Sequence, residues 1–185
     1  MQILERSKSE IIAKAERMSD FLKMEYLENC TKKFSDADIQ RYCFLELSKL
    51  YERNVMYPDA IKYLARYEEI CPTNREKLLA YIKELEILIK GGLYDRVEFV
   101  YKKAKDISTP RELIDLDLRI SHLYHEEAEK FDKLNKYTPA LKVYERLLVL
   151  AKGEEKIEIK KRLAYLYNKL GRVREAIEME RDLKR

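Results

Sequence analysis

The sequence predicts an all-α protein, a right-handed α-solenoid of about four helical hairpins with an N-terminal helical cap. Three observations predict this fold class. Apolar residues recur at three- and four-residue spacing along most of the 185 residues, which is the helical period. Gly and Pro number only four each, so long helical runs go uninterrupted. Small residues and chain reversals also return together at a near-constant interval, as in repeat proteins.

The first 40 residues have a helical pattern but no repeat register. Residues 3–29 fit either one helix or two, because Ser19–Asp20 would cap a second helix that begins near Phe21. Ser35 is the predicted N-cap of the helix that follows. We therefore expect residues 1–40 to form a helical cap over the repeats.

The interval between hairpins is the strongest repeat signal. The residue expected at the close contact of each returning helix is Ala60, Val97, Ala140 or Ala176, at intervals of 37, 43 and 36 residues. The longest interval exceeds the others by roughly two helical turns, and an insertion of whole turns keeps the apolar face inward. The predicted array covers residues 41–185, with hairpins at about 36–74, 75–110, 111–152 and 153–185.

The last hairpin carries the clearest motif. Leu163, Ala164, Tyr167, Gly171 and Ala176 stand at the spacing of the tetratricopeptide (TPR) repeat, which the chain resembles. The other hairpins resemble it through Phe44, Leu47, Ser48, Tyr51, Ala60 and Pro72 in the first, Tyr81, Gly92 and Tyr101 in the second, and Ser121, Tyr124 and Ala140 in the third. A simple helical bundle is the competing fold, but it does not require small residues and turns to recur at one interval.

The resemblance implies a binding face. In TPR arrays the first helix of each hairpin lines a concave groove that binds a peptide or a partner helix. The same register points to Lys49, Arg53, Lys83, Glu86, Arg119, His122, Lys161, Arg162, Tyr165 and Asn168. This set becomes more basic toward the C-terminus, so we expect an acidic or C-terminal protein segment as the partner. Lys49 and Glu86 stand where chaperone-binding members of the family have Asn, which departs from their carboxylate clamp.

No enzyme is predicted, and no cofactor or metal. The 34 acidic residues produce pairs at helical spacing without any acid–base role. Gly91–Gly92 lacks the Lys-Ser/Thr of a phosphate-binding loop and is better explained as a hairpin turn. His122 and His125 share one helix face but have no third ligand nearby in the sequence. The predicted function is therefore non-catalytic protein binding, as an adaptor, scaffold or assembly subunit.

Nucleic-acid binding is the alternative function. The net charge of +4 is the small difference between 38 basic and 34 acidic residues, whereas nucleic-acid domains usually carry a stronger basic stripe. The excess lies in the second and last hairpins. The residues that would contact phosphates are Lys102, Lys103, Lys105, Lys160, Lys161, Arg162, Arg172 and Arg174.

The sequence predicts a cytoplasmic protein. Three cysteines at unpaired spacing suggest neither a disulfide framework nor a zinc site. The N-terminal residues have charges throughout, and no apolar run reaches transmembrane length, so we expect neither export nor a membrane span. The last hairpin has no covering helix after Leu183, so self-association through its outer face is a further expectation.

Overall fold

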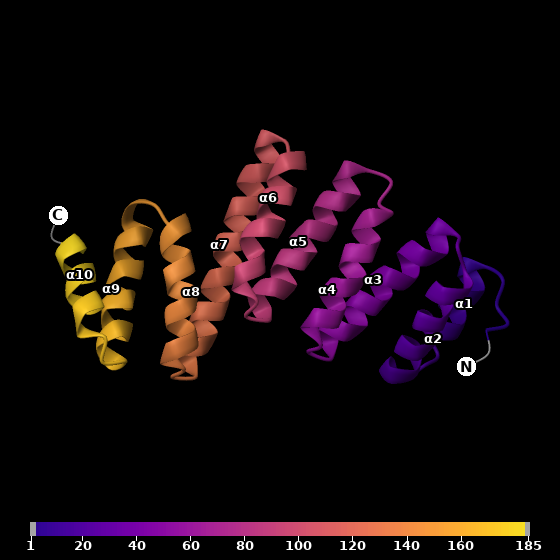
Figure 1. The fold of residues 1–185 in the computed structure, drawn as a ribbon, viewed down its shortest axis with the longest axis horizontal. Coiled ribbons are helices and arrows are strands. Elements are labelled where there is room, and N and C mark those ends of the chain that lie inside the picture. The colour runs from indigo at the N-terminus through magenta and orange to yellow at the C-terminus, as the bar shows by residue number, and fades with distance from the viewer. Residues whose placement is uncertain (1–2, 184–185) are drawn as a thin grey trace. The chain divides into compact units, whose positions relative to one another are not determined.

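The computed structural model describes residues 3–183, which form ten α-helices, one short 3-10 helix and no strand. The chain divides into two compact units, of which the first ends at Ile107 and the second begins at Ser108. Figure 1 labels the helices in chain order. The predicted all-α class is confirmed. The right-handed sense of the array and its division near residue 40 stay predictions.

Unit 1 is a succession of helices that pack on their neighbours in the sequence. It contains α1 (Lys8–Ala15), α2 (Asp20–Lys33), α3 (Ala37–Arg53), α4 (Tyr57–Glu69), α5 (Asn74–Lys90), the 3-10 helix η1 (Tyr94–Arg96) and α6 (Val97–Ile107). α2 packs on α3, α3 on α4, α4 on α5, and α5 on α6. This nearest-neighbour pattern is typical of helical repeats.

Unit 2 has the same pattern in two hairpins. Its helices are α7 (Pro110–Lys133), α8 (Tyr137–Leu150), α9 (Gly153–Lys169) and α10 (Val173–Leu183), and each packs on the next. α7 is the longest helix in the described part of the chain, as the 43-residue interval predicts. It begins with a capping box, in which Thr109 and Glu112 bond each other's backbone N–H groups.

The four hairpin turns share one backbone geometry. Each has a residue in the left-handed region five positions before the close-contact residue, namely Val55, Gly92, Asn135 and Gly171, with φ of 62°, 69°, 52° and 74°. In each turn the next N–H donates to the carbonyl five residues earlier at 2.9 Å, as from Met56 to Tyr51, Leu93 to Leu88, Lys136 to Phe131 and Arg172 to Tyr167. This is the Schellman ending of a helix. The hairpins α3–α4, α5–α6, α7–α8 and α9–α10 are therefore equivalent in backbone.

Small residues lie where the helices of each hairpin meet. Ala60, Ala140 and Ala176 are buried, and Val97 fills the same position in the second hairpin, also buried. A side chain of one or three carbons lets two helix backbones approach closely. The register proposed from the sequence therefore marks buried positions in all four hairpins.

Helix starts correct one detail of the sequence interpretation. Asp36, not Ser35, caps α3, because its carboxylate accepts hydrogen bonds at 2.9 Å from the N–H groups of Asp38 and Ile39. Ser35 lies one residue too early to reach these donors. Residues 3–29 contain two helices, and Ser19 is at the N-cap of the second but makes no capping hydrogen bond through its side chain.

Within residues 3–183, no helix combines the length and apolar character that a bilayer crossing requires.

Candidate functional site: the first-helix faces

The predicted groove residues lie on the first helices of the four hairpins. Lys49 and Arg53 are on α3, Lys83 and Glu86 on α5, Arg119 and His122 on α7, and Lys161, Arg162, Tyr165 and Asn168 on α9. The first four belong to unit 1 and the other six to unit 2.

The unit 1 face is nearly neutralised by its own ion pairs. The ammonium of Lys49 lies 2.8 Å from Glu46, and that of Lys83 lies 2.9 Å from Glu52 and 3.2 Å from Glu86. Burial tends to lower the pKa of Lys83, but the hydrogen bond and charge of Glu52 outweigh it, so the pKa is raised. A lysine held between two carboxylates has little capacity to receive a third.

The remaining cation of the unit 1 face joins two helices. Arg53 on α3 lies 3.2 Å from Asp20 on α2, and both side chains are largely exposed. An exposed pair of this kind contributes little to stability. Glu86 is buried, with 8% of its surface exposed, and it contacts Lys83.

The unit 2 face is organised around Arg162. Its guanidinium makes two contacts with the carboxylate of Asp132 on α7, at 3.0 Å from Nε and 2.8 Å from an NH2 nitrogen. The hydroxyl of Tyr144 donates to the same carboxylate at 2.7 Å. The bond from Asp132 raises the pKa of Arg162. Arg162 therefore fixes α9 against α7, and this role differs from the free partner contact that the sequence predicts.

Tyr165 is the exposed aromatic residue of this face. Its ring is 41% exposed and is flanked by the Arg162 guanidinium, 4.7 Å from the ring centre, and by the Lys169 ammonium at 5.5 Å. Asn168 is exposed on the same helix. Lys161 is also exposed, although it lies 2.7 Å from Glu158. α9 thus presents an aromatic surface between two cations.

The two histidines do not form a metal site. His122 lies 3.6 Å from Glu126, and His125 lies 2.7 Å from Glu155 at the start of α9. Across residues 3–183 no group of three or more His, Cys, Asp or Glu side chains is placed to hold a metal ion. His125 instead links α7 to α9, and Arg119 and His122 are exposed on α7.

One ion pair recurs at the same repeat positions in both units. Glu52 and Asp132 each lie eight residues before the close-contact Ala of their hairpins, and Lys83 and Arg162 each lie fourteen residues before the close-contact residue of the next hairpin. Both pairs join the first helices of successive hairpins. Equivalent residues thus make equivalent contacts, in addition to the four equivalent turns. The fold is a TPR-like helical repeat.

The basic residues of the nucleic-acid alternative are mostly engaged by carboxylates. Five of the eight have an ion pair within 4 Å, namely Lys103 with Glu68, Lys160 with Asp182, Lys161 with Glu158, Arg162 with Asp132, and Arg172 with Glu145 and Glu175. Cations already paired in this way displace few counterions from nucleic-acid phosphates. Fewer free cations are therefore available to phosphates than the eight basic residues in the sequence suggest.

A buried carboxyl pair lies between the first two hairpins and was not identified from the sequence. Glu68 on α4 and Glu84 on α5 are 6% and 3% exposed, and they interact with each other. Burial, and then the hydrogen bond and charge of Glu84, raise the pKa of Glu68 to about 8. The Lys103 ammonium lies 3.9 Å from Glu68, and the Arg96 guanidinium lies 3.4 Å from Glu84. No local pattern identifies this pair, because the residues belong to different hairpins.

A second unforeseen contact joins α2 to the first hairpin. One carboxylate oxygen of Glu28 accepts hydrogen bonds from the hydroxyls of Tyr51 and Tyr63, both at 2.7 Å, and the two rings stack 5.5 Å apart. Burial favours the neutral carboxyl, but these bonds outweigh it and lower the pKa of Glu28. The tyrosine hydroxyls are satisfied inside the molecule, so these rings are packing residues.

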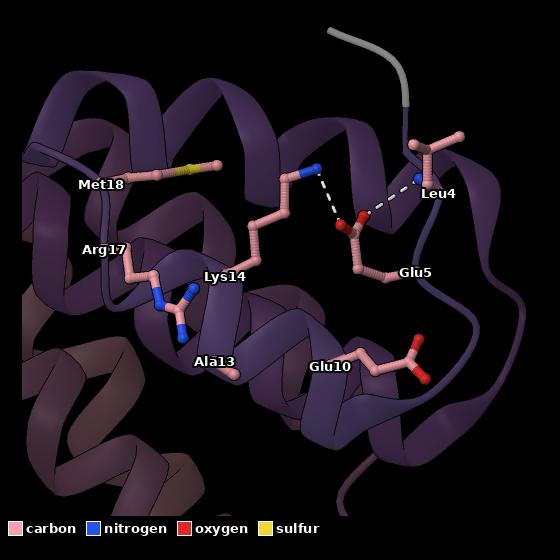
Figure 2. Close-up of a pocket in the computed structure, with 7 residues that line it drawn as sticks. All are labelled: Leu4, Glu5, Glu10, Ala13, Lys14, Arg17 and Met18. Carbon is pink, nitrogen blue, oxygen red and sulfur yellow. Dashed lines mark hydrogen bonds and ion pairs between the residues drawn. The ribbon is translucent and has the colours of Figure 1, made fainter.

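A pocket of about 620 Å³ lies on the N-terminal segment, away from the predicted face (Figure 2). It is lined by Leu4, Glu5, Glu10, Ala13, Lys14, Arg17 and Met18. The Lys14 ammonium points to Glu5 at 2.8 Å, and this bond lowers the pKa of Glu5 to about 2. Glu5 and Lys14, two of the four charged residues on the pocket wall, are therefore paired with each other.

No family model matches the chain, and no curated protein is similar to it. Solved structures are similar over most of its length at low identity. The alignment with the structure of MamA AMB-1 covers 96% of this chain and 87% of that one, with 17% identity and a TM-score of 0.41. A Podosopora anserina structure, titled for kinesin light chain and nearly identical TPR-like repeats, covers 96% and 91%, with 14% identity and a TM-score of 0.39. BtubC (BKLC) from P. vanneervenii covers 95% and 78%, with 16% identity and a TM-score of 0.41.

Proposed function

We propose that this protein is a non-catalytic protein-binding module, an adaptor or assembly subunit, and that the α9 face of unit 2 binds an acidic segment of a protein partner. The observation that carries the proposal is the exposed Tyr165 ring, flanked by Arg162 and Lys169. Free thiols at all three cysteines fit the reducing cytoplasm as its location.

The chemistry of the α9 face suits a protein segment. Tyrosine offers a large apolar ring with a hydroxyl at its edge, a combination enriched at the centres of interfaces. The Lys169 ammonium beside the ring attracts carboxylates and steers their approach. The amide of Asn168 can bond a peptide backbone, because it carries both donors and an acceptor. On unit 1, Lys49, Arg53, Lys83 and Glu86 stay a prediction as partner contacts.

The test uses variants that leave the structural pair Arg162–Asp132 intact. We expect Tyr165→Ala to weaken binding to acidic peptides from an immobilised library by about tenfold or more, because an interface aromatic typically contributes over 1 kcal/mol. Lys169→Glu should also weaken the binding of these peptides, and the effect should be larger at low salt than at high salt, since salt screens exposed charges. Fluorescence polarisation of individual peptides measures both effects.

The control is Lys142→Glu, which makes the same charge change at an exposed position of α8. It should bind every peptide as the parent does. If Tyr165→Ala and Lys169→Glu bind all hits as tightly as the parent, the α9 face is not the binding site. Binding of a single-stranded oligonucleotide at low ionic strength, with no peptide bound, would instead favour the nucleic-acid function.

Self-association through α10 is a second proposed contact. Ile177 is 46% exposed, whereas Ile61 and Leu141 at the same repeat position are 1% and 4% exposed. Val173 is 55% exposed on the same helix. An apolar residue at a position that is buried elsewhere in the array suits a second copy of the chain. Light scattering that shows only monomer at high concentration would remove this proposal.

A further inference from the structure

Two buried cysteines lie on neighbouring helices of unit 1. Cys30 is in the last turn of α2 and Cys43 in the second turn of α3, and only residues 34–36 separate the two helices. Both side chains are 0% exposed and belong to the same apolar core. α2 and α3 pack directly on each other. The end of α2 and the start of α3 lie on either side of residues 34–36, and this brings the two thiols together.

The thiols interact as an unequal pair. A hydrogen bond from Cys43 lowers the pKa of the Cys30 thiol, while that bond and burial raise the pKa of the Cys43 thiol. The thiolate is the form that reacts with oxidants and disulfides. The lowered pKa favours Cys30 as the nucleophile, and Cys43 can then resolve an oxidised Cys30.

We propose that Cys30 and Cys43 are a redox modification site, which a peroxide converts to a reversible intramolecular disulfide that joins α2 to α3. The Cys30 sulfur attacks one oxygen of hydrogen peroxide, the O–O bond breaks, and Cys30 becomes a sulfenic acid as the first water leaves. The Cys43 sulfur then attacks the Cys30 sulfur, the S–O bond breaks, and the second water leaves. Two thiols lose two hydrogens, and one peroxide is reduced to two waters.

Charged side chains of the N-terminal segment act on this pair. The charge of Glu5 raises the pKa of the Cys30 thiol, and the charge of Lys14 lowers it. Glu5 and Lys14 are bonded to each other and form one wall of the pocket in Figure 2. The negative charge of Glu5 disfavours the Cys30 thiolate, so Glu5→Gln should oxidise faster than the parent.

Tryptic digestion separates all three cysteines, which makes the test direct. Cys30 falls in peptide 24–32, Cys43 in 42–49 and Cys71 in 67–75. The full chain is treated with a small excess of hydrogen peroxide under native conditions, alkylated, digested without reductant and analysed by mass spectrometry. We expect peptides 24–32 and 42–49 to be linked, with a mass two hydrogens below their sum, and dithiothreitol to separate them. Cys71 should not appear in this species.

Three variants make the result decisive. Cys30→Ala and Cys43→Ala should each abolish the linked species, and alanine suits a buried site because a thiol there packs as a small apolar group. Cys71→Ala is the matched control and should leave the yield unchanged. The proposal is overturned if the two peptides stay unlinked at peroxide levels that oxidise Cys71, or if the link forms only after denaturation. Circular dichroism of each variant confirms that the fold is retained.

Discussion

At the scale of single residues, Glu68 is a buried carboxyl whose pKa is raised well above its ordinary value. It is buried beside Glu84, and the two carboxyls cannot both ionise without repulsion in a poorly solvated site. Its pKa of about 8 is above the ordinary value of 4.5. The neutral form therefore predominates in the folded protein at neutral pH, while the unfolded chain is ionised.

This difference predicts a pH dependence of stability. The contribution of a raised pKa is fully present below pH 4.5 and is lost as the pH rises through 8, so the free energy of unfolding should fall between pH 5 and pH 8. The expected fall is on the order of 2–4 kcal/mol. Glu68→Gln cannot ionise and should flatten this dependence. Urea denaturation at both pH values measures it.

The control for this prediction is Glu69→Gln, on the exposed side of the same helix. It should keep the pH dependence of the parent. A Glu68→Gln protein that loses as much stability between pH 5 and pH 8 as the parent would show that Glu68 is ionised in the folded state.

At the scale of elements, the turns explain why four different sequences form one kind of hairpin. Gly92 and Gly171 adopt positive φ at no steric cost, and Asn135 tolerates it. Val55 does not, because its branched side chain is unfavourable in the left-handed region. Its conformation is imposed by the helices on either side, so the first turn stores strain that the others lack.

Replacement of Val55 should release this strain. Val55 is 67% exposed, so Val55→Gly removes little packing and should stabilise unit 1 by about 1 kcal/mol. Asn135→Gly should gain less, since asparagine already tolerates positive φ. Thermal denaturation followed by circular dichroism compares the two. A lower Tm for Val55→Gly would mean that the valine side chain contributes more than its backbone costs.

The recurrent ion pair makes a second prediction at this scale. Asp132 and Arg162 are joined by two contacts and are partly buried, so a double-mutant cycle with Ala should give a coupling energy of about 1 kcal/mol. Glu52 and Lys83 should couple less, because Lys90 and Glu86 remain as alternative partners. Equal couplings, or none for Asp132–Arg162, would refute this ranking of the two pairs.

At the scale of the molecule, the sequence predicts the repeat well because it depends on local signals. The sequence of a single hairpin is enough to recognise the helical spacing, the close-contact position and the glycine turn. The long α7 follows from the interval before Ala140 in the same way. These features depend on backbone geometry, which residue type restricts directly.

Contacts between hairpins cannot be predicted from such local signals. The sequence places Arg162 on the partner-binding face, and it gives no sign of the contact with Asp132, thirty residues earlier in the chain. Glu28 and its two tyrosines, and Glu68 with Glu84, also join different helices. The repeat register could have found the pairs Glu52–Lys83 and Asp132–Arg162, because both stand at the same positions in successive hairpins.

The hairpins dock mainly on their neighbours in the sequence, and native-state hydrogen exchange of Leu166→Ala tests this most directly. Leu166 is fully buried on α9, and its truncation should cost about 3 kcal/mol locally. The repeat architecture predicts that amide protection falls in α8, α9 and α10, while α3, α4 and α5 keep the protection of the parent. An equal loss of protection in all these helices is the behaviour of a single cooperative bundle and would contradict it.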